Sequence, residues 1–216
     1  MERIYLFSGL GADQRIFAQL DLSGFEIIPI QWLKPRPAEA FESYVFRLAE
    51  HHQIPKQGST VIGLSFGGIC ISELSKYYDF HKTVLISSAK TKDELPKVLS
   101  FSKLLAIHKK MPSPTQLKWA NPIIYWFFGI KTDQEKKLLN DMMVDADPDF
   151  EQWAIDKIVH WDNVHVPQNC LHIHGDKDRL IPIQHVDYSI RIRGAGHFMV
   201  WNKATEISFH IRNFLL

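Results

Sequence analysis

The stretch 59–70, STVIGLSFGGIC, constrains the fold of this chain more than any other. Residues 60–62 form a β-branched run typical of a buried strand, and from Ile69 onward apolar side chains recur at helical spacing. Between these segments lies the pentapeptide GLSFG, in which two glycines flank Ser65. Glycine suits a turn so tight that neighbouring backbone segments leave no room for larger side chains. The stretch therefore predicts a strand, a sharp turn that presents the Ser65 hydroxyl at the top of a sheet, and a helix.

Strand and helix patterns alternate through most of the chain. The first helical patterns cover about 14–20, 41–48 and 69–78, and the closing segment carries an apolar stripe from Val200 to Phe214 that predicts one helix. Near-continuous apolar strands that alternate with helices are typical of a parallel sheet covered on both faces. We therefore predict an α/β fold with a mostly parallel sheet of about six strands, at 3–7, 25–32, 60–62, 81–87, 170–174 and about 189–192.

The alternation stops between residues 92 and 161, where helical signals occur without a convincing strand. Two helix starts are marked there, by a capping box at 132–135 and by Asp147 followed by a proline. We predict a core of residues 1–91 and 162–216 with an inserted helical cap at 92–161. For the aromatic residues of 119–128 we favour a place in the cap core over contact with the substrate. Further helical signals in the cap come from Leu104, Leu105 and Ile107.

The composition bounds the size of the protein and the kind of partner it can have. With 216 residues, 45% of them hydrophobic, the chain can fill one compact core. Its 25 lysines and arginines nearly balance 24 aspartates and glutamates, so no net charge favours nucleic acid, an anionic membrane or a highly charged substrate. We expect a small-molecule partner, with no nucleic acid and no membrane, and the composition does not predict an oligomeric state.

Two further features bear on the compartment. The strand pattern at 3–7 leaves no room ahead of it for a signal peptide, and the longest apolar stretch, 122–130, is about half of what a membrane-spanning helix needs. Cys70 and Cys170 lie in predicted core elements, where cysteine usually serves as a small buried hydrophobe. We expect a cytoplasmic protein with both cysteines reduced.

A serine hydroxyl is a weak nucleophile unless a histidine takes its proton, and that histidine needs a carboxylate to orient it. His197 lies in a small-residue loop between the last predicted strand and the closing helix, and Asp178 follows the strand before that one. Because the carboxyl ends of parallel strands meet at one edge of a sheet, both loops open at the same edge as Ser65. The sequence therefore predicts a catalytic triad of Ser65, Asp178 and His197.

The assignment of the acid leaves alternatives open. Asp176 is only two residues from Asp178, and an acid after an earlier strand would also reach the same edge of the sheet. The other candidates for this role are Asp93, Glu94 and Asp162.

Two histidines suggest a different kind of site. His172 and His174 alternate along a predicted strand and therefore share a face, as a metal-binding pair would. A third ligand at a recognisable spacing is missing from the sequence. We therefore favour structural packing for both histidines and predict no metal site.

The motifs around these residues resemble those of the α/β-hydrolase family, and the resemblance covers nearly the whole chain. GLSFG matches the nucleophile elbow, GDKDRLIP at 175–182 resembles the acid loop, and GAGHF at 194–198 resembles the histidine loop. SGLG at 8–11 resembles the oxyanion loop H-G-x-G, with Ser8 in place of the usual histidine. The resemblance implies that the backbone N–H groups of Leu10 and Phe66 form the oxyanion hole. The family's first two strands have no counterpart, which implies a shortened α/β-hydrolase fold.

The resemblance also implies acyl transfer at Ser65. His197 takes the serine proton, the alkoxide attacks an ester or thioester carbonyl, and water later hydrolyses the acyl-enzyme, so no cofactor is needed. We expect a carboxylesterase-like serine hydrolase acting on a small or medium, uncharged ester. The same site leaves open a thioesterase, an amidase or a lyase. The fold also leaves open a non-catalytic ligand-binding protein.

Overall fold

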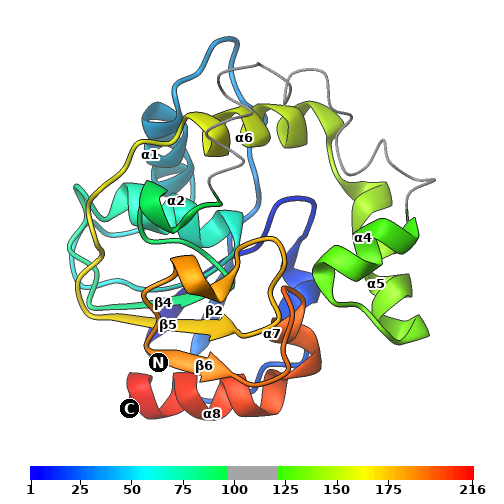
Figure 1. The fold of residues 1–216 in the computed structure, drawn as a ribbon. Coiled ribbons are helices and arrows are strands. Elements are labelled where there is room, and N and C mark those ends of the chain that lie inside the picture. Colours follow the sequence, from blue (N-terminus) through cyan, green and yellow to red (C-terminus); the bar gives the residue numbers. More distant parts are fainter. Residues whose placement is uncertain (97–120) are drawn as a thin grey trace.

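A six-stranded sheet forms the centre of the molecule (Figure 1). The computed structural model describes residues 1–96 and 121–216. The strands lie in the order β2-β1-β3-β4-β5-β6, and every neighbouring pair is parallel, which confirms the predicted α/β class. The strands are β1 (Arg3–Phe7), β2 (Glu26–Pro29), β3 (Thr60–Leu64), β4 (Lys82–Ile86), β5 (Cys170–Gly175) and β6 (Ile190–Ile192).

Helices cover both faces of this sheet (Figure 1). On one face lie α1 (Phe41–His51) and α2 (Phe66–Leu74), and on the other lies α8 (Ala204–Leu215). The helix α1 turns one stripe inward, because its four buried residues, Tyr44, Val45, Leu48 and Ala49, recur at helical spacing. Within the two described ranges, no helix combines the length and the apolar character that crossing a bilayer requires.

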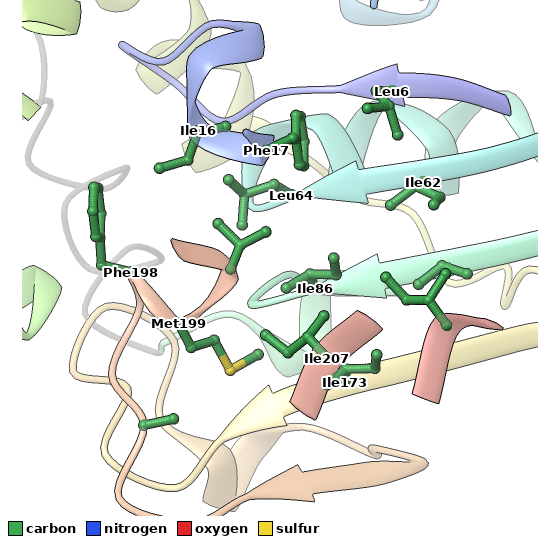
Figure 2. Close-up of a cluster of buried hydrophobic side chains, with 14 of the residues drawn as sticks. Leu6, Ile16, Phe17, Ile62, Leu64, Ile86, Ile173, Phe198, Met199 and Ile207 are labelled. Carbon is green, nitrogen blue, oxygen red and sulfur yellow. The ribbon is translucent and has the colours of Figure 1, made fainter. Parts of the chain in front are cut away.

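The two faces of the strands contribute to two separate hydrophobic clusters. Val61 of β3 points to the side of α1 and α2. Its neighbour Ile62 points to the opposite side, into the cluster that also contains Ile86, Ile173 and Ile207 of α8 (Figure 2). Because each strand is buried on both sides, apolar residues follow one another without alternation. This explains the continuous apolar runs in the sequence.

The helix α2 ends at Leu74, before the predicted end at 78. Two other predicted helices differ in kind or number from the observed ones. The first is a 3-10 helix, η1 (Gln14–Phe17), shorter than the predicted 14–20. The Asp13 carboxylate accepts a hydrogen bond from the Arg15 N–H at its start, and Ala18 N donates to Arg15 O at its end. These local bonds close short turns that do not extend into an α-helix.

The predicted closing helix is two helices, α7 (Met199–Asn202) and α8, separated at Lys203. Lys203 has φ −124° and ψ 22°, outside the helical range. Next to it, the Asn202 amide donates a 2.7 Å hydrogen bond to the Glu135 carboxylate from a distant helix. This long-range hydrogen bond lies where the helix is interrupted, and the spacing of apolar residues in the sequence does not reveal the interruption.

In the described residues, the segment between β4 and β5 supplies four more helices. Both helix starts predicted there are confirmed: Thr132 and Glu135 form the capping box, and the Asp147 side chain caps the other helix ahead of Pro148. The helices are η2 (Lys92–Glu94), α4 (Asn121–Phe128), α5 (Asp133–Asp145) and α6 (Pro148–His160), and a further short one, η5 (Ile183–His185), follows β5. The predictions that lie outside the described residues are those at Leu104, Leu105, Ile107 and Trp119.

The helices α5 and α6 pack against opposite sides of the core. Met142 of α5 joins the cluster beneath α8, and an ion pair of 2.6 Å between Asp145 and Arg15 ties the end of α5 to η1. Phe150 and Ala154 of α6 join the cluster on the side of α1 and α2. Residues 133–160 therefore reach the hydrophobic clusters on both faces of the sheet.

Two histidines of β5 lie inside the protein. His172 and His174 have no exposed surface, and their rings meet edge to face with centroids 5.4 Å apart. Among the described residues, no three histidine, cysteine, aspartate or glutamate side chains gather as metal ligands would. Burial, together with His174 and Lys90, lowers the pKa of His172 to about 3. His172 is therefore uncharged in the folded protein at neutral pH.

We expect the free energy of unfolding to decrease as the pH falls below about 6.5, the pKa of histidine in an unfolded chain. Between that pH and the folded-state pKa of about 3, the unfolded state binds one more proton at His172 than the folded state. Each pH unit in this window then costs about 1.4 kcal/mol from this residue. Urea unfolding followed by circular dichroism at several pH values measures the slope. His172→Leu should flatten it by about that amount, and an equal slope in both proteins would contradict the prediction.

Candidate active site

Ser65 occupies the sharp turn between β3 and α2, as predicted. Its backbone has φ 51° and ψ −117°, a conformation that residues other than glycine rarely adopt. Phe66, the next residue, already begins α2. A Cβ atom at Gly67 would collide with the carbonyl oxygens of Phe7 and Ser8 at the end of β1. The turn can approach β1 this closely only because residue 67 has no side chain.

Three side chains from separate loops form a chain of hydrogen bonds. The Ser65 hydroxyl lies 2.9 Å from His197 Nε2, and His197 Nδ1 lies 2.7 Å from Asp178 Oδ2. With Asp178 charged, Nδ1 carries the proton and donates it, which leaves Nε2 free to accept from the serine. The loops after β3, β5 and β6 bring the three residues together at the carboxyl edge of the sheet. The structure thus brings together the three residues predicted as a triad.

The Asp178 carboxylate is buried, and both of its oxygens accept hydrogen bonds. Its Oδ1 accepts from the backbone N–H groups of Leu180, at 2.9 Å, and Ile181, at 3.0 Å. Burial alone raises the pKa of a carboxyl group, but here the charge and hydrogen bond of His197, the Ile181 N–H and the nearby His174 outweigh it and lower the pKa of Asp178. The group is therefore ionised at neutral pH, as an acceptor for His197 must be.

Asp176, the nearest alternative for the acid, has other partners. Its side chain binds Arg191 at 2.8 Å and accepts a 2.7 Å hydrogen bond from the backbone N–H of Gly194. Gly194 belongs to the loop that carries His197. Asp176 therefore holds the start of the histidine loop and does not contact the imidazole.

The remaining alternatives also lie away from the histidine. Glu94 is buried and accepts hydrogen bonds from the backbone N–H groups of Lys90 and Asp187, and its burial raises the pKa of its carboxyl group. Asp93 and Asp162 are exposed. Of the carboxylates weighed from the sequence, the one hydrogen-bonded to His197 is Asp178.

The loop after β1 lies beside the serine. A Cβ atom on Gly9 would lie 3.5 Å from Ser65 Cβ, in van der Waals contact. Within the described part of the chain, the backbone N–H groups of Leu10 and Phe66 donate no hydrogen bond. Unsatisfied N–H groups beside a nucleophile are the kind of donor that stabilises an oxyanion.

Ser8 braces this loop, at the position where the family motif has histidine. Its hydroxyl donates a 2.8 Å hydrogen bond to Ala12 O across the loop and accepts a 3.0 Å hydrogen bond from Trp32 Nε1. The serine therefore supplies a local bond of its own within the loop. The partner Trp32 follows β2 and carries no sequence signal that would pair it with Ser8.

An apolar cavity of about 300 Å³ opens onto Ser65 and His197. Among the described residues of its wall, these two supply the polar side chains, and the other side chains are apolar. They come from the oxyanion loop, α2, α4, α5, α6 and the acid loop, for example Leu10, Ile69, Phe128, Met142, Ile158 and Leu180. A cavity of this kind favours an uncharged, largely hydrocarbon ligand.

The aromatic run 119–128 behaves less uniformly than predicted. Ile124 is buried, but Trp126 and Phe127 are exposed by 56% and 38%. Phe128 lines the cavity, and its ring meets the His197 ring edge to face at 5.5 Å. Helical spacing alone could not distinguish Phe128 from its neighbours, because the contact depends on how α4 lies over the histidine loop.

Comparison with known proteins identifies the fold. No protein-family model matches the chain, and no curated protein does. A bromoperoxidase from Bacillus anthracis superposes with a TM-score of 0.69 at 18% identity, covering 99% of this chain and 91% of that one. An esterase from Thermogutta terrifontis gives 0.74 at 14% identity, with coverages of 100% and 89%. The protein has the α/β-hydrolase fold.

A third α/β-hydrolase fold, the meta-cleavage product hydrolase of Pseudomonas fluorescens IP01, matches with a TM-score of 0.68 at 16% identity. The superposition covers 100% of this chain and 90% of the hydrolase chain. The activities named for these three proteins differ, and their sequence identities to this chain are 18% or less. The likeness therefore shows the fold, and the function has to be inferred from the site itself.

We expect Ser65 to react with a fluorophosphonate probe, and Asp178→Asn to slow this reaction by about 10³ to 10⁴. Asparagine keeps the size of the side chain but disturbs the proton arrangement that leaves His197 Nε2 free to accept. Intact-mass spectrometry of the labelled protein over time measures the rate. Asp176→Asn is the matched control, because it retains an oxygen for the Gly194 N–H, and it should slow labelling less than about tenfold. Equal losses in the two variants would reverse the assignment of the acid.

Proposed function

We propose that the protein is a serine hydrolase that cleaves small or medium, uncharged esters through an acyl-enzyme. The observation that carries the proposal is the unbroken series of hydrogen bonds from Ser65 through His197 to a buried, ionised Asp178. A strained serine, a neutral acceptor nitrogen and an orienting carboxylate together form an activated nucleophile. The likeness in fold to proteins described as esterases and hydrolases agrees with this reaction class.

The reaction follows from the positions of these groups. His197 Nε2 takes the proton of Ser65, and the serine oxygen attacks the ester carbonyl. The N–H groups of Leu10 and Phe66 stabilise the oxyanion of the tetrahedral intermediate. The imidazolium, stabilised by Asp178, then returns the proton to the leaving alcohol. A water molecule, activated by the same histidine, hydrolyses the acyl-enzyme and restores the free serine.

The cavity supports the choice of substrate. The described residues of its wall offer no charged partner, so a charged acyl group would lose its hydration there without compensation. Met142 of α5 and Ile158 of α6 form part of the wall, which supports a cap role for residues 92–161 over the core of 1–91 and 162–216. In this proposal the cap selects the acyl or alcohol group, and the core performs the chemistry.

We expect wild-type protein to hydrolyse p-nitrophenyl esters and Ser65→Ala to lose about 10⁶ in kcat. Within the range that the cavity holds, each added methylene should raise kcat/KM up to about fourfold, because burying a methylene contributes about 0.8 kcal/mol. A terminal carboxylate on the acyl chain should lower kcat/KM more than about 100-fold. Release of p-nitrophenol, measured over a series of acyl lengths, gives all three values.

Labelling of Ser65 by the fluorophosphonate probe separates a serine hydrolase from a ligand-binding protein. A folded wild-type protein that neither hydrolyses esters nor forms an adduct at Ser65 would refute the hydrolase and leave a ligand-binding protein. Equal turnover by wild type and Ser65→Ala would remove the serine from the mechanism. Matched oxygen esters, thioesters and amides of one acyl group then rank the three leaving groups at the same site.

A further inference from the structure

A second histidine lies behind the acid of the site. His174, near the end of β5, has no exposed surface. Its Nε2 lies 2.8 Å from the carbonyl oxygen of Ile181 and 3.6 Å from Asp178 Oδ2. This carboxylate oxygen is the one that also meets His197 Nδ1. The two imidazoles therefore approach the same oxygen of Asp178.

The partners of His174 determine its proton arrangement. Both atoms that face Nε2, a carbonyl oxygen and a carboxylate oxygen, are acceptors, so Nε2 must carry the proton and donate. Burial lowers the pKa of His174, which the charge of Asp178 opposes. The ring is thus a neutral donor whose N–H dipole points at the Ile181 carbonyl and the acid.

The hydrogen bonds of His174 and Asp178 meet at Ile181. Ile181 donates its N–H to Asp178 Oδ1 and accepts from His174 through its carbonyl oxygen. His174 therefore holds the turn that supplies two N–H groups to the acid. Among the described residues, the side chains of basic type within 4.0 Å of the Asp178 carboxylate are His174 and His197.

We propose that His174 is a positioning residue for the reaction, which holds the Asp178 turn through Ile181 and stabilises the carboxylate charge on the side away from the substrate. This inference rests on the proposed function. His174 touches neither the serine nor the cavity, so its effect on the reaction passes through Asp178 and then through His197.

The neighbouring His172 provides a matched control. It lies two residues earlier on the same face of β5, is equally buried, and meets the His174 ring edge to face. In the described part of the chain, its side chain forms neither an ion pair nor a hydrogen bond with Asp178. A loss of packing alone should therefore appear equally in variants of both histidines, whereas a loss of positioning should appear only at His174.

The charged groups around the acid set the expected pH effect. Asp178 faces His197 and His174, and His174 faces Asp178, His197 and His172. Behind His172 lies Lys90, which pairs with Asp187 and Glu94. Without the His174 donor, the carboxylate holds a proton more tightly and also holds the imidazolium of His197 more strongly. Both changes require a higher pH before the site becomes active.

The test compares His174→Leu, His174→Gln and His172→Leu in p-nitrophenyl butyrate hydrolysis from about pH 5 to 9. We expect His174→Leu to lower kcat about 10- to 100-fold with little change in KM, and to move the acid limb of kcat/KM upward by about 0.5 to 1 pH unit. Glutamine can place an N–H near the position of Nε2 and should recover most of both effects. His172→Leu should keep kcat within about threefold of the wild-type value and leave the acid limb of kcat/KM at the wild-type pH.

Several results would overturn the inference. Matching pH profiles and kcat values in His174→Leu and His172→Leu would assign both histidines to packing alone. If circular dichroism shows that His174→Leu does not fold, His174→Met replaces it, because methionine removes the same donor and has a similar length. A wild-type pH profile of kcat/KM in His174→Met would then overturn the inference. A His174→Gln variant as inactive as His174→Leu would also count against the inference.

One readout does not depend on activity. Nitrogen-15 spectra of the imidazole rings report the tautomer of His174, and the inference requires a neutral ring protonated at Nε2 at neutral pH. Protonation at Nδ1 instead would overturn it. A wild-type protein without turnover or Ser65 labelling, but with this tautomer, would refute the proposed function and leave the geometry of His174 intact.

Discussion

Where β3 ends, the chain turns so sharply that residue 67 touches the carbonyl oxygens of Phe7 and Ser8. The rest of the site depends on this backbone contact. It places Ser65 against the loop after β1, and it leaves the N–H of Phe66 beside the serine at the start of α2. A strained conformation of this kind persists only where the surroundings over-determine it. Here β3 and α2 are buried along their whole length, so the sheet and the helix hold the turn from both ends.

The acid and the histidine depend on a second set of backbone contacts. Gly175 lies so close to the carbonyl of Ala195 that a side chain there would collide with it, and Lys177 N donates a 2.8 Å hydrogen bond to the same carbonyl oxygen. The backbones of the acid loop and the histidine loop are therefore in direct contact, in addition to the contact between their side chains. Asp176 adds a bond to the histidine loop, and Asp178 contacts the imidazole. Two aspartates two residues apart have different roles because the turn directs them to different partners.

The parts of the site that follow short motifs could be predicted, and the parts that depend on packing could not. The sequence predicted Ser65, Asp178 and His197, because parallel strands bring their carboxyl ends to one edge. It left the acid open, because Asp176 lies within the same motif and spacing does not reveal side-chain direction. The bond between Ser8 and Trp32 was not predictable, because the two residues lie on separate strand-to-helix connections and meet only in space.

The sequence by itself determined the α/β class, the order of the three loops and the helix starts at Thr132 and Asp147, since each depends on local periodicity or on capping chemistry. Only the tertiary structure decided what surrounds those loops. The residues of the cavity wall come from segments that lie far apart in the chain, from the oxyanion loop near its start to the histidine loop near its end. The buried contact of His174 with Asp178 likewise depends on a turn that folds back onto its own strand. Side-chain direction and long-range proximity are set by packing, and a linear pattern does not contain them.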